Sequence, residues 1–150
     1  MLLSPVSPMK SQWDKVSFAS TLLLCPIIDS LVSLVPGKWH PEIRLGLQEA
    51  LVNAAKHGNN LDPRKQVIVR FCFMEGEYWW VISDEGSGFS PPVSNSRDLV
   101  EYLPDQESES GRGMFILHQI FDRVVWNRQG TEIRLCKKMC SRLNPEPILS

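Results

Sequence analysis

The 150-residue sequence lacks an excess of charge of either sign. It has 16 Lys and Arg residues and 17 Asp and Glu residues, a formal net charge of −1. A protein that grips nucleic acid by its phosphates needs clustered basic residues, and no basic run here is longer than the pair Lys137-Lys138. The composition therefore predicts no direct nucleic-acid partner.

The sequence also lacks a long hydrophobic run. Its most apolar segment, Leu22–Ile28, is much shorter than the roughly 20 residues that cross a bilayer, and Pro26 interrupts it. The first residues do not combine a charged segment with an apolar one, as a secretion signal would. We therefore expect no membrane contact and predict a soluble, cytoplasmic protein.

Cysteine is scarce, and its spacing does not suit a metal site. No Cys-x-x-Cys pair occurs, and no His accompanies a cysteine at zinc spacing. The spacing does not indicate a disulfide framework either. The four residues are expected to be reduced thiols packed as small apolar side chains. They are Cys25, Cys72, Cys136 and Cys140.

The length fits one domain with a single core. Residues 1–13, with two prolines and three serines, are predicted to be a flexible lead-in, and residues 139–150 a C-terminal tail. The domain itself is expected over residues 14–138. Within it, the polar and acidic segment 90–110 is predicted to be a lid, since a long loop in a compact domain is usually functional or disordered.

Hydrophobic periodicity predicts an alternation of strands and helices. The expected elements are a half-buried strand at 15–20, helices at 26–35 and 40–57, strands at 66–74 and 78–83, a buried helix at 114–121, and strands at 124–126 and 131–135. This order predicts an α/β (α+β) two-layer sandwich, in which helices cover one face of a mixed sheet.

A polar stripe is predicted on the second helix. Glu49, Asn53 and Lys56 stand at i, i+4 and i+7, which places them within about 60° of one another on an α-helix. Such a stripe is commonly a solvated face. The alternative is a binding site, because a carboxylate, an amide and an ammonium group are costly to bury without a ligand.

Two glycine-rich motifs favour the binding site. Asp84 ends a predicted strand, where its carboxylate can accept a hydrogen bond from the amino group of adenine. Gly86 and Gly88 follow and allow the backbone to approach a flat ligand closely. Gly111 and Gly113 precede a predicted helix, whose free N–H groups and dipole attract phosphate.

The polar stripe supplies complementary chemistry. The amide oxygen of Asn53 suits a Mg²⁺ ion that phosphates and waters already hold. Glu49, one turn earlier, can orient or deprotonate an attacking hydroxyl in phosphoryl transfer. Each motif alone is weak, since glycine pairs often serve as ordinary turns. All three in this order are hard to obtain by chance.

These motifs resemble a known family. Residues Glu49–Asn59, Asp84–Phe89 and Glu109–Ile116 look like the N, G1 and G2 boxes of the GHKL ATPase superfamily, which includes gyrase and the histidine kinases. Within it, the chain is similar to bacterial anti-sigma factor serine kinases over residues 14–138. The resemblance implies a Bergerat-type ATP-binding fold with ATP and Mg²⁺ as cofactors.

The resemblance also assigns roles to the residues. Glu49 would be the general base and Asn53 the Mg²⁺ ligand. Asp84 would recognise the adenine amino group, with Gly86 and Gly88 in the wall of the adenine pocket.

The phosphates would be held by the third motif. Gly111, Arg112 and Gly113 would cradle them under the lid, and Met114 completes the predicted ATP-binding set. The role of Lys56 stays open between a phosphate contact and a solvated helix end. The same two interpretations apply to His57, while Arg112 could point outward.

The resemblance implies an anti-sigma factor that is also a protein-serine kinase. It would bind a sigma factor, phosphorylate a STAS-type antagonist and so regulate transcription by partner switching. One alternative is a stress-signalling switch kinase that binds no sigma factor, and another is a nucleotide-gated binding module with little catalysis. Glu49 argues against the last. A homodimer is compatible with the resemblance, and the strand near 16–20 offers an edge for pairing.

Overall fold

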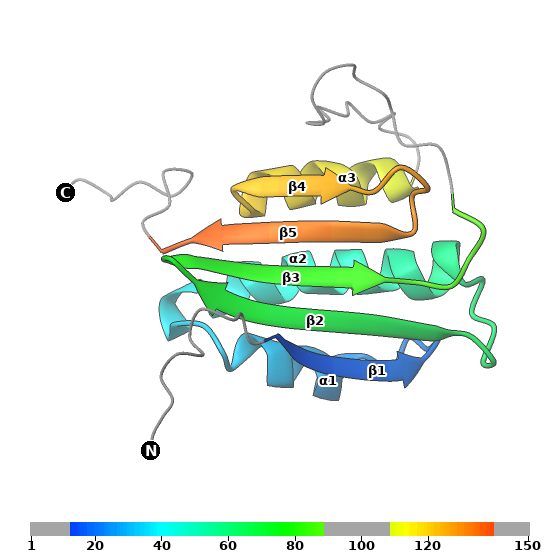
Figure 1. The fold of residues 1–150 in the computed structure, drawn as a ribbon. Helices are drawn as coiled ribbons and strands as arrows, with labels where there is room; N and C mark the ends of the chain where they lie inside the picture. Colours follow the sequence, from blue (N-terminus) through cyan, green and yellow to red (C-terminus); the bar gives the residue numbers. More distant parts are fainter. Residues whose placement is uncertain (1–12, 89–108, 140–150) are drawn as a thin grey trace.

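A five-stranded sheet with helices on one face forms the protein (Figure 1). The computed structural model describes residues 13–88 and 109–139. The strands are β1 (Asp14–Ala19), β2 (Gln66–Met74), β3 (Glu77–Ser83), β4 (Arg123–Trp126) and β5 (Glu132–Lys138), in the spatial order β1-β2-β3-β5-β4.

The α-helices of the described residues lie behind the sheet in Figure 1. They are α1 (Cys25–Val32), α2 (His40–Val52) and α3 (Glu109–Ile120); a 3-10 turn, η2 (Gly37–Trp39), precedes α2, and a π-helical segment, η3 (Asn53–Gly58), follows it. Residues 90–108 of the predicted lid at 90–110, most of the lead-in and most of the tail lie outside the described residues.

The predicted α+β two-layer sandwich is confirmed, but the sheet is not mixed. All four neighbouring pairs of strands are antiparallel. The crossover through α3 does join two strands that run in the same direction, β3 and β4. β5 then returns from β4 and lies between them, so the two parallel strands are not neighbours.

The core lies between the sheet and the helices. On β2 and β3 every second side chain faces the helices, as the pleat of a strand requires. α2 presents apolar residues at a spacing of about four, which places them on one face. The main buried side chains from these three elements are Val67, Val69, Phe71, Tyr78, Trp80, Ile82, Ile43, Leu47 and Leu51.

Strand β1 is more exposed than its alternating sequence predicts. It is an edge strand, paired only with β2 within the described sheet. Its residues are exposed apart from Phe18, which is half-buried and packs against the core. The prediction of a half-buried strand was therefore wrong for most of β1, because alternation gives the two faces of a strand but not what covers them.

Helices α2 and α3 approach closely through one glycine each. A Cβ atom on Gly46 of α2 would lie 2.6 Å from a ring carbon of Phe121, just beyond α3. A Cβ atom on Gly113 of α3 would lie 2.8 Å from Oε1 of Glu49 on α2. The missing side chains allow the two backbones to pack closer than larger residues would.

Helix α3 differs from its prediction in two respects. It begins at Glu109 and not at Met114, so Gly111 and Gly113 lie inside its first turns. It was also predicted to be buried all round, whereas Phe115 is 51% exposed. Within the described residues, no helix is long and apolar enough to cross a membrane.

The cysteines follow the prediction in part. Cys72 and Cys136 are free and buried, whereas Cys25 is free and exposed. Burial, with the nearby carboxylates of Glu77 and Asp122, raises the pKa of the Cys136 thiol to about 12. That thiol therefore stays protonated and unreactive at neutral pH.

A lysine is buried where α2, α3 and the sheet meet. The side chain of Lys137 on β5 is 1% exposed. Its Nζ donates a hydrogen bond to the carbonyl oxygen of Ile120 at 3.1 Å and pairs with Glu42 Oε2 at 3.4 Å. It also lies 5.4 Å from the ring centroid of Trp39. Lys137 thus places a positive charge at the C-terminus of α3, where the helix dipole favours it.

Candidate functional site

A cavity of about 310 Å³ opens between η3, the end of β3, α3 and the β4–β5 turn. Its walls are mainly apolar, with a few polar groups, as is usual for a small-molecule site. The apolar walls include Ala50, Ala54, Ile82, Met114, Trp126 and Ile133. The polar side chains are Asn53, His57, Asp84 and Ser87, with Asn60 at the same site.

The predicted helix changes its pitch at Asn53. From Asn53 to Gly58 the backbone is π-helical, and the N–H group of Asn59 donates to the carbonyl of Ala54, five residues earlier, at 2.9 Å. π-turns are rare and often occur at functional sites. The regular spacing that predicted the polar stripe ends here. Asn53 and His57 line the cavity; Lys56, also predicted there, does not line it.

Asp84 stands at the floor of the cavity. The turn of the last hairpin and the Gly86 backbone hold it: its N–H donates to the carbonyl of Thr131 at 2.9 Å, and Oδ1 accepts from the N–H of Gly86 at 2.8 Å. Burial raises the pKa of the Asp84 carboxyl, and the Gly86 N–H and the charge of Lys65 offset this in part. The site therefore holds a poorly hydrated acceptor facing an apolar cavity.

The glycines beside Asp84 are required by close contacts. A Cβ atom on Gly58 would collide with the carboxylate of Asp84, and one on Gly86 would overlap the carbonyl oxygen of Gly58. Gly88 has φ of +87° and lies against the carbonyl of Gln129. The glycines predicted to let the backbone approach a ligand thus also allow close packing of the protein's own backbone and side chains.

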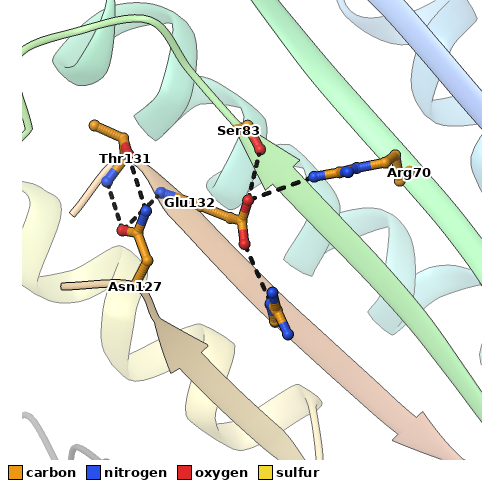
Figure 2. A network of polar contacts seen from close by, with 6 residues as sticks. Arg70, Ser83, Asn127, Thr131 and Glu132 are labelled. Atoms are coloured by element: carbon orange, nitrogen blue, oxygen red, sulfur yellow. Dashed lines mark hydrogen bonds and ion pairs between the residues drawn. The ribbon is translucent and has the colours of Figure 1, made fainter. Parts of the chain in front are cut away.

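A polar network holds the turn that forms one wall of the cavity (Figure 2). Oδ1 of Asn127 accepts from the N–H of Thr131 at 2.9 Å, and its Nδ2 donates to Thr131 Oγ1 at 3.0 Å. Oε1 of Glu132 accepts from Ser83 Oγ at 3.2 Å and pairs with Arg70 at 3.4 Å. The turn is therefore fixed to β2 and β3.

The first and third motifs meet on the helical layer. Glu49, one turn before Asn53, lies against Gly113 and does not itself line the cavity. Gly111 and Arg112 belong to the first turn of α3, where unpaired N–H groups are expected. Met114, two residues on, lines the cavity. The fold thus brings the predicted base and the predicted phosphate-binding turn to one side of the cavity.

The side chains suit Mg²⁺ only if a ligand supplies further oxygens. Among the described residues, no three His, Cys, Asp or Glu side chains form a cluster that could hold a metal. Asn53 offers one neutral oxygen at the cavity wall. Mg²⁺ is commonly held by one or two protein oxygens together with phosphates and waters, and this donor set fits that pattern.

The sequence did not reveal all residues that line the cavity. Trp126 and Ile133 are cross-strand partners on β4 and β5, and both face the cavity. The two strands themselves were predicted, at 124–126 and 131–135. Which of their side chains face α3 depends on register, and only the alternation of apolar residues in the two strands could have indicated them.

The chain is similar in sequence to known proteins. A family model described as "Histidine kinase-like ATPase domain" matches residues 27–137. The serine-protein kinase RsbW of Bacillus subtilis (strain 168) is 30% identical over 101 residues, which cover 64% of this chain and 62% of that protein. The anti-sigma F factor of Geobacillus thermodenitrificans (strain NG80-2) is 31% identical over 117 residues, 76% of this chain and 73% of that protein. The match to RsbW thus spans less than two thirds of that kinase.

Proposed function

The chain belongs to the family of histidine kinase-like ATPase domains, and from this we propose that it binds ATP beside Asp84 and transfers the γ-phosphate to a serine of a partner protein. One observation carries the proposal. A half-buried carboxylate that is held by backbone groups faces an apolar cavity, and a helix N-terminus and a second carboxylate lie on the same side.

The base of ATP fits the polar arrangement of the cavity floor. An ionised Asp84 accepts a hydrogen bond from the amino group of adenine, whereas guanine presents a carbonyl oxygen at that place and is repelled. The apolar walls formed by Ala54, Met114 and Ile133 pack against the faces of the ring.

The triphosphate would extend toward the first turn of α3. There the backbone N–H groups of Gly111 and Arg112 and the helix dipole stabilise negative charge. Asn53 would hold Mg²⁺ together with the phosphate oxygens, and the ion supplies charge neutralisation. Glu49 would accept the proton of the serine hydroxyl as it attacks, the part of a general base.

The names of the relatives indicate the partners. One is called a serine-protein kinase and others are called anti-sigma F factors. We therefore propose that the chain, in the cytoplasm, binds a sigma factor and phosphorylates a STAS-type antagonist. Transcription would then be regulated by a switch of the chain between these two partners. A homodimer is part of the same proposal.

The test is transfer of labelled γ-phosphate to a STAS-domain protein encoded beside this chain. The wild type should label a serine of that protein, and Glu49→Gln should bind ATP with similar affinity but transfer phosphate at least about 100-fold more slowly, since a positioned base contributes about that factor. Equal rates for both proteins would refute the role of Glu49. ATP binding without any transfer would favour a nucleotide-gated binding module, and transfer without co-purification of a sigma factor would favour a switch kinase.

A further inference from the structure

We propose that Asn59 is a positioning residue that fixes the base-reading carboxylate of Asp84, and thereby sets the preference for adenine over guanine nucleotides. This inference rests on the proposed ATP site and names a residue that does not touch the ligand. Asn59 follows Gly58, which contacts Asp84, and its side chain has no exposed surface.

The side chain of Asn59 uses both of its amide protons. Nδ2 donates to Ser20 Oγ at 2.8 Å and to the carbonyl oxygen of Gln66 at 3.0 Å. Oδ1 accepts from the N–H of Glu85 at 2.7 Å. A carbonyl needs a donor and an N–H needs an acceptor, so these partners determine which way the amide points.

The bond to Glu85 acts directly on Asp84. The N–H of Glu85 belongs to the peptide unit that joins Asp84 to Glu85, so Oδ1 of Asn59 fixes the orientation of that peptide. The carboxylate of Glu85 in turn accepts from the N–H of Gln66 at 2.9 Å. The segment 84–86 is thus tied to the start of β2 directly through the Glu85 carboxylate and indirectly through Asn59, and it packs on the carbonyl of Gly58.

The partners of Asn59 lie at the ends of three different strands. Ser20 follows β1, Gln66 begins β2 and Glu85 follows β3. Ser20 is itself held, since its hydroxyl donates to the carbonyl of Lys65 at 2.9 Å. A fully satisfied buried network of this kind is rigid, whereas a partly satisfied one is costly. The backbone that carries Asp84 is therefore set by the amide of a residue on the helical side.

A buried Asn could also serve stability alone, and the two roles differ in their effect on specificity. Loss of stability alone weakens ATP and GTP alike. A displaced Asp84 weakens ATP, whose amino group it meets, and relieves the repulsion of the guanine carbonyl. The ratio of the two affinities therefore reports the position of the carboxylate.

The experiment measures the Kd of ATP and of GTP by calorimetry, at a temperature where circular dichroism shows each variant folded. Asn59→Ala should lower the ATP preference about tenfold, the effect of one well-placed hydrogen bond. Asn59→Asp keeps an oxygen for the Glu85 N–H but loses both donations from Nδ2, so it should lower the preference less than Asn59→Ala, by about threefold, although both variants unfold at lower temperature. An equal loss for ATP and GTP in Asn59→Ala would overturn the proposal.

Ser20→Ala decides the question if Asn59→Ala does not fold. It removes one of the two acceptors that orient the amide and leaves the Glu85 contact in place. We expect the ATP preference to fall about threefold, a part of the effect of one hydrogen bond, and an unchanged preference would refute the proposal. A wild type that binds neither nucleotide would instead refute the ATP site itself, so the two failures are distinguishable.

Discussion

The carboxylate of Glu49 on α2 lies against the backbone of Gly113 on α3. A Cβ atom on Gly113 would come within 2.8 Å of Glu49 Oε1, closer than real contacts of this kind. The two residues belong to motifs more than 60 positions apart in the sequence, and their contact places the proposed base beside the helix that would bind phosphate.

This contact predicts that Gly113→Ala separates stability from activity. Alanine is a better helix former than glycine by about 1 kcal/mol, and the atom it would meet ends a flexible side chain. The variant should therefore unfold at the same or a higher denaturant concentration. Phosphate transfer should fall about tenfold, because small displacements of a catalytic group reduce the rate strongly.

Glu49→Gln provides the control for this prediction. When the carboxylate is already absent, adding Gly113→Ala should change the rate of phosphate transfer by less than about twofold, as expected for two changes that act through one group. If the two changes multiplied in the double variant, Gly113 would act on something other than Glu49.

The ionised carboxylate of Asp84 is predicted to lower the stability of the ligand-free protein. Its pKa is raised in the folded state, chiefly by burial, so the folded protein binds a proton more readily than the unfolded chain does. The ionised group is therefore unfavourable at neutral pH, and this penalty shrinks as the pH falls through the raised pKa and is gone below the ordinary pKa of an aspartate. Asp84→Asn should be at least as stable as the wild type at pH 7, with the difference shrinking on acidification.

The same substitution should abolish recognition of the base. The amide can present an N–H group to the adenine amino group, and the charge-assisted hydrogen bond is lost, which should weaken ATP binding at least about tenfold. In the wild type, ATP affinity should fall as acid protonates Asp84. Calorimetry and thermal unfolding across pH measure both effects. As a control, Asp14→Asn, at an exposed position on β1, should change neither the stability nor the ATP affinity.

Gly86 is predicted to tolerate no side chain. A methyl group there would overlap the carbonyl oxygen of Gly58, and backbone cannot yield as a side chain tip can. Gly86→Ala should destabilise the protein by about 1–3 kcal/mol and weaken ATP binding, because Asp84 must move. Gly37→Ala is the matched control, since nothing lies within 4 Å of its added methyl group. Denaturant unfolding that gives the same midpoint for both variants would contradict the prediction.

The sequence predicts the parts of this fold that local patterns determine. β2 spans the predicted residues 66–74, because Val, Ile and Phe alternate there between the core and the outer face. Asp84 follows the end of β3, as predicted, since the apolar run stops at Ser83. These features depend on residues that are neighbours in the sequence.

Features that depend on long-range contacts were missed. The place of β5 between β3 and β4 is a pairing of distant segments, and no local pattern encodes it. The π-helical turn at Asn53–Gly58 ends where the backbone of Gly86 packs on the carbonyl of Gly58, and no local pattern indicated the start of α3 at Glu109. The sequence left the roles of Lys56 and His57 open, and in the structure it is His57 that lines the cavity.

Lys137 is predicted to stabilise the fold through both its stem and its charged end. Lys137→Ala removes the buried stem and leaves the carbonyl of Ile120 without its donor, which should lower the free energy of unfolding by about 3 kcal/mol. Lys137→Met keeps most of the apolar volume and loses only the charged end. Its cost should be about 1–2 kcal/mol, because Glu42 is 34% exposed and can be hydrated instead.

Denaturant unfolding of the two variants separates these contributions, and Lys138→Met serves as the control on the neighbouring exposed side chain. That control should change the free energy of unfolding by less than about 0.5 kcal/mol. Lys137 lies at the C-terminal end of α3, whereas the proposed phosphate site is at its N-terminal end, so ATP affinity should be unchanged in folded Lys137→Met. An equal loss of stability in Lys137→Met and Lys137→Ala would assign the whole effect to the charged end. A loss of ATP affinity in Lys137→Met would mean that α3 transmits the change along its length.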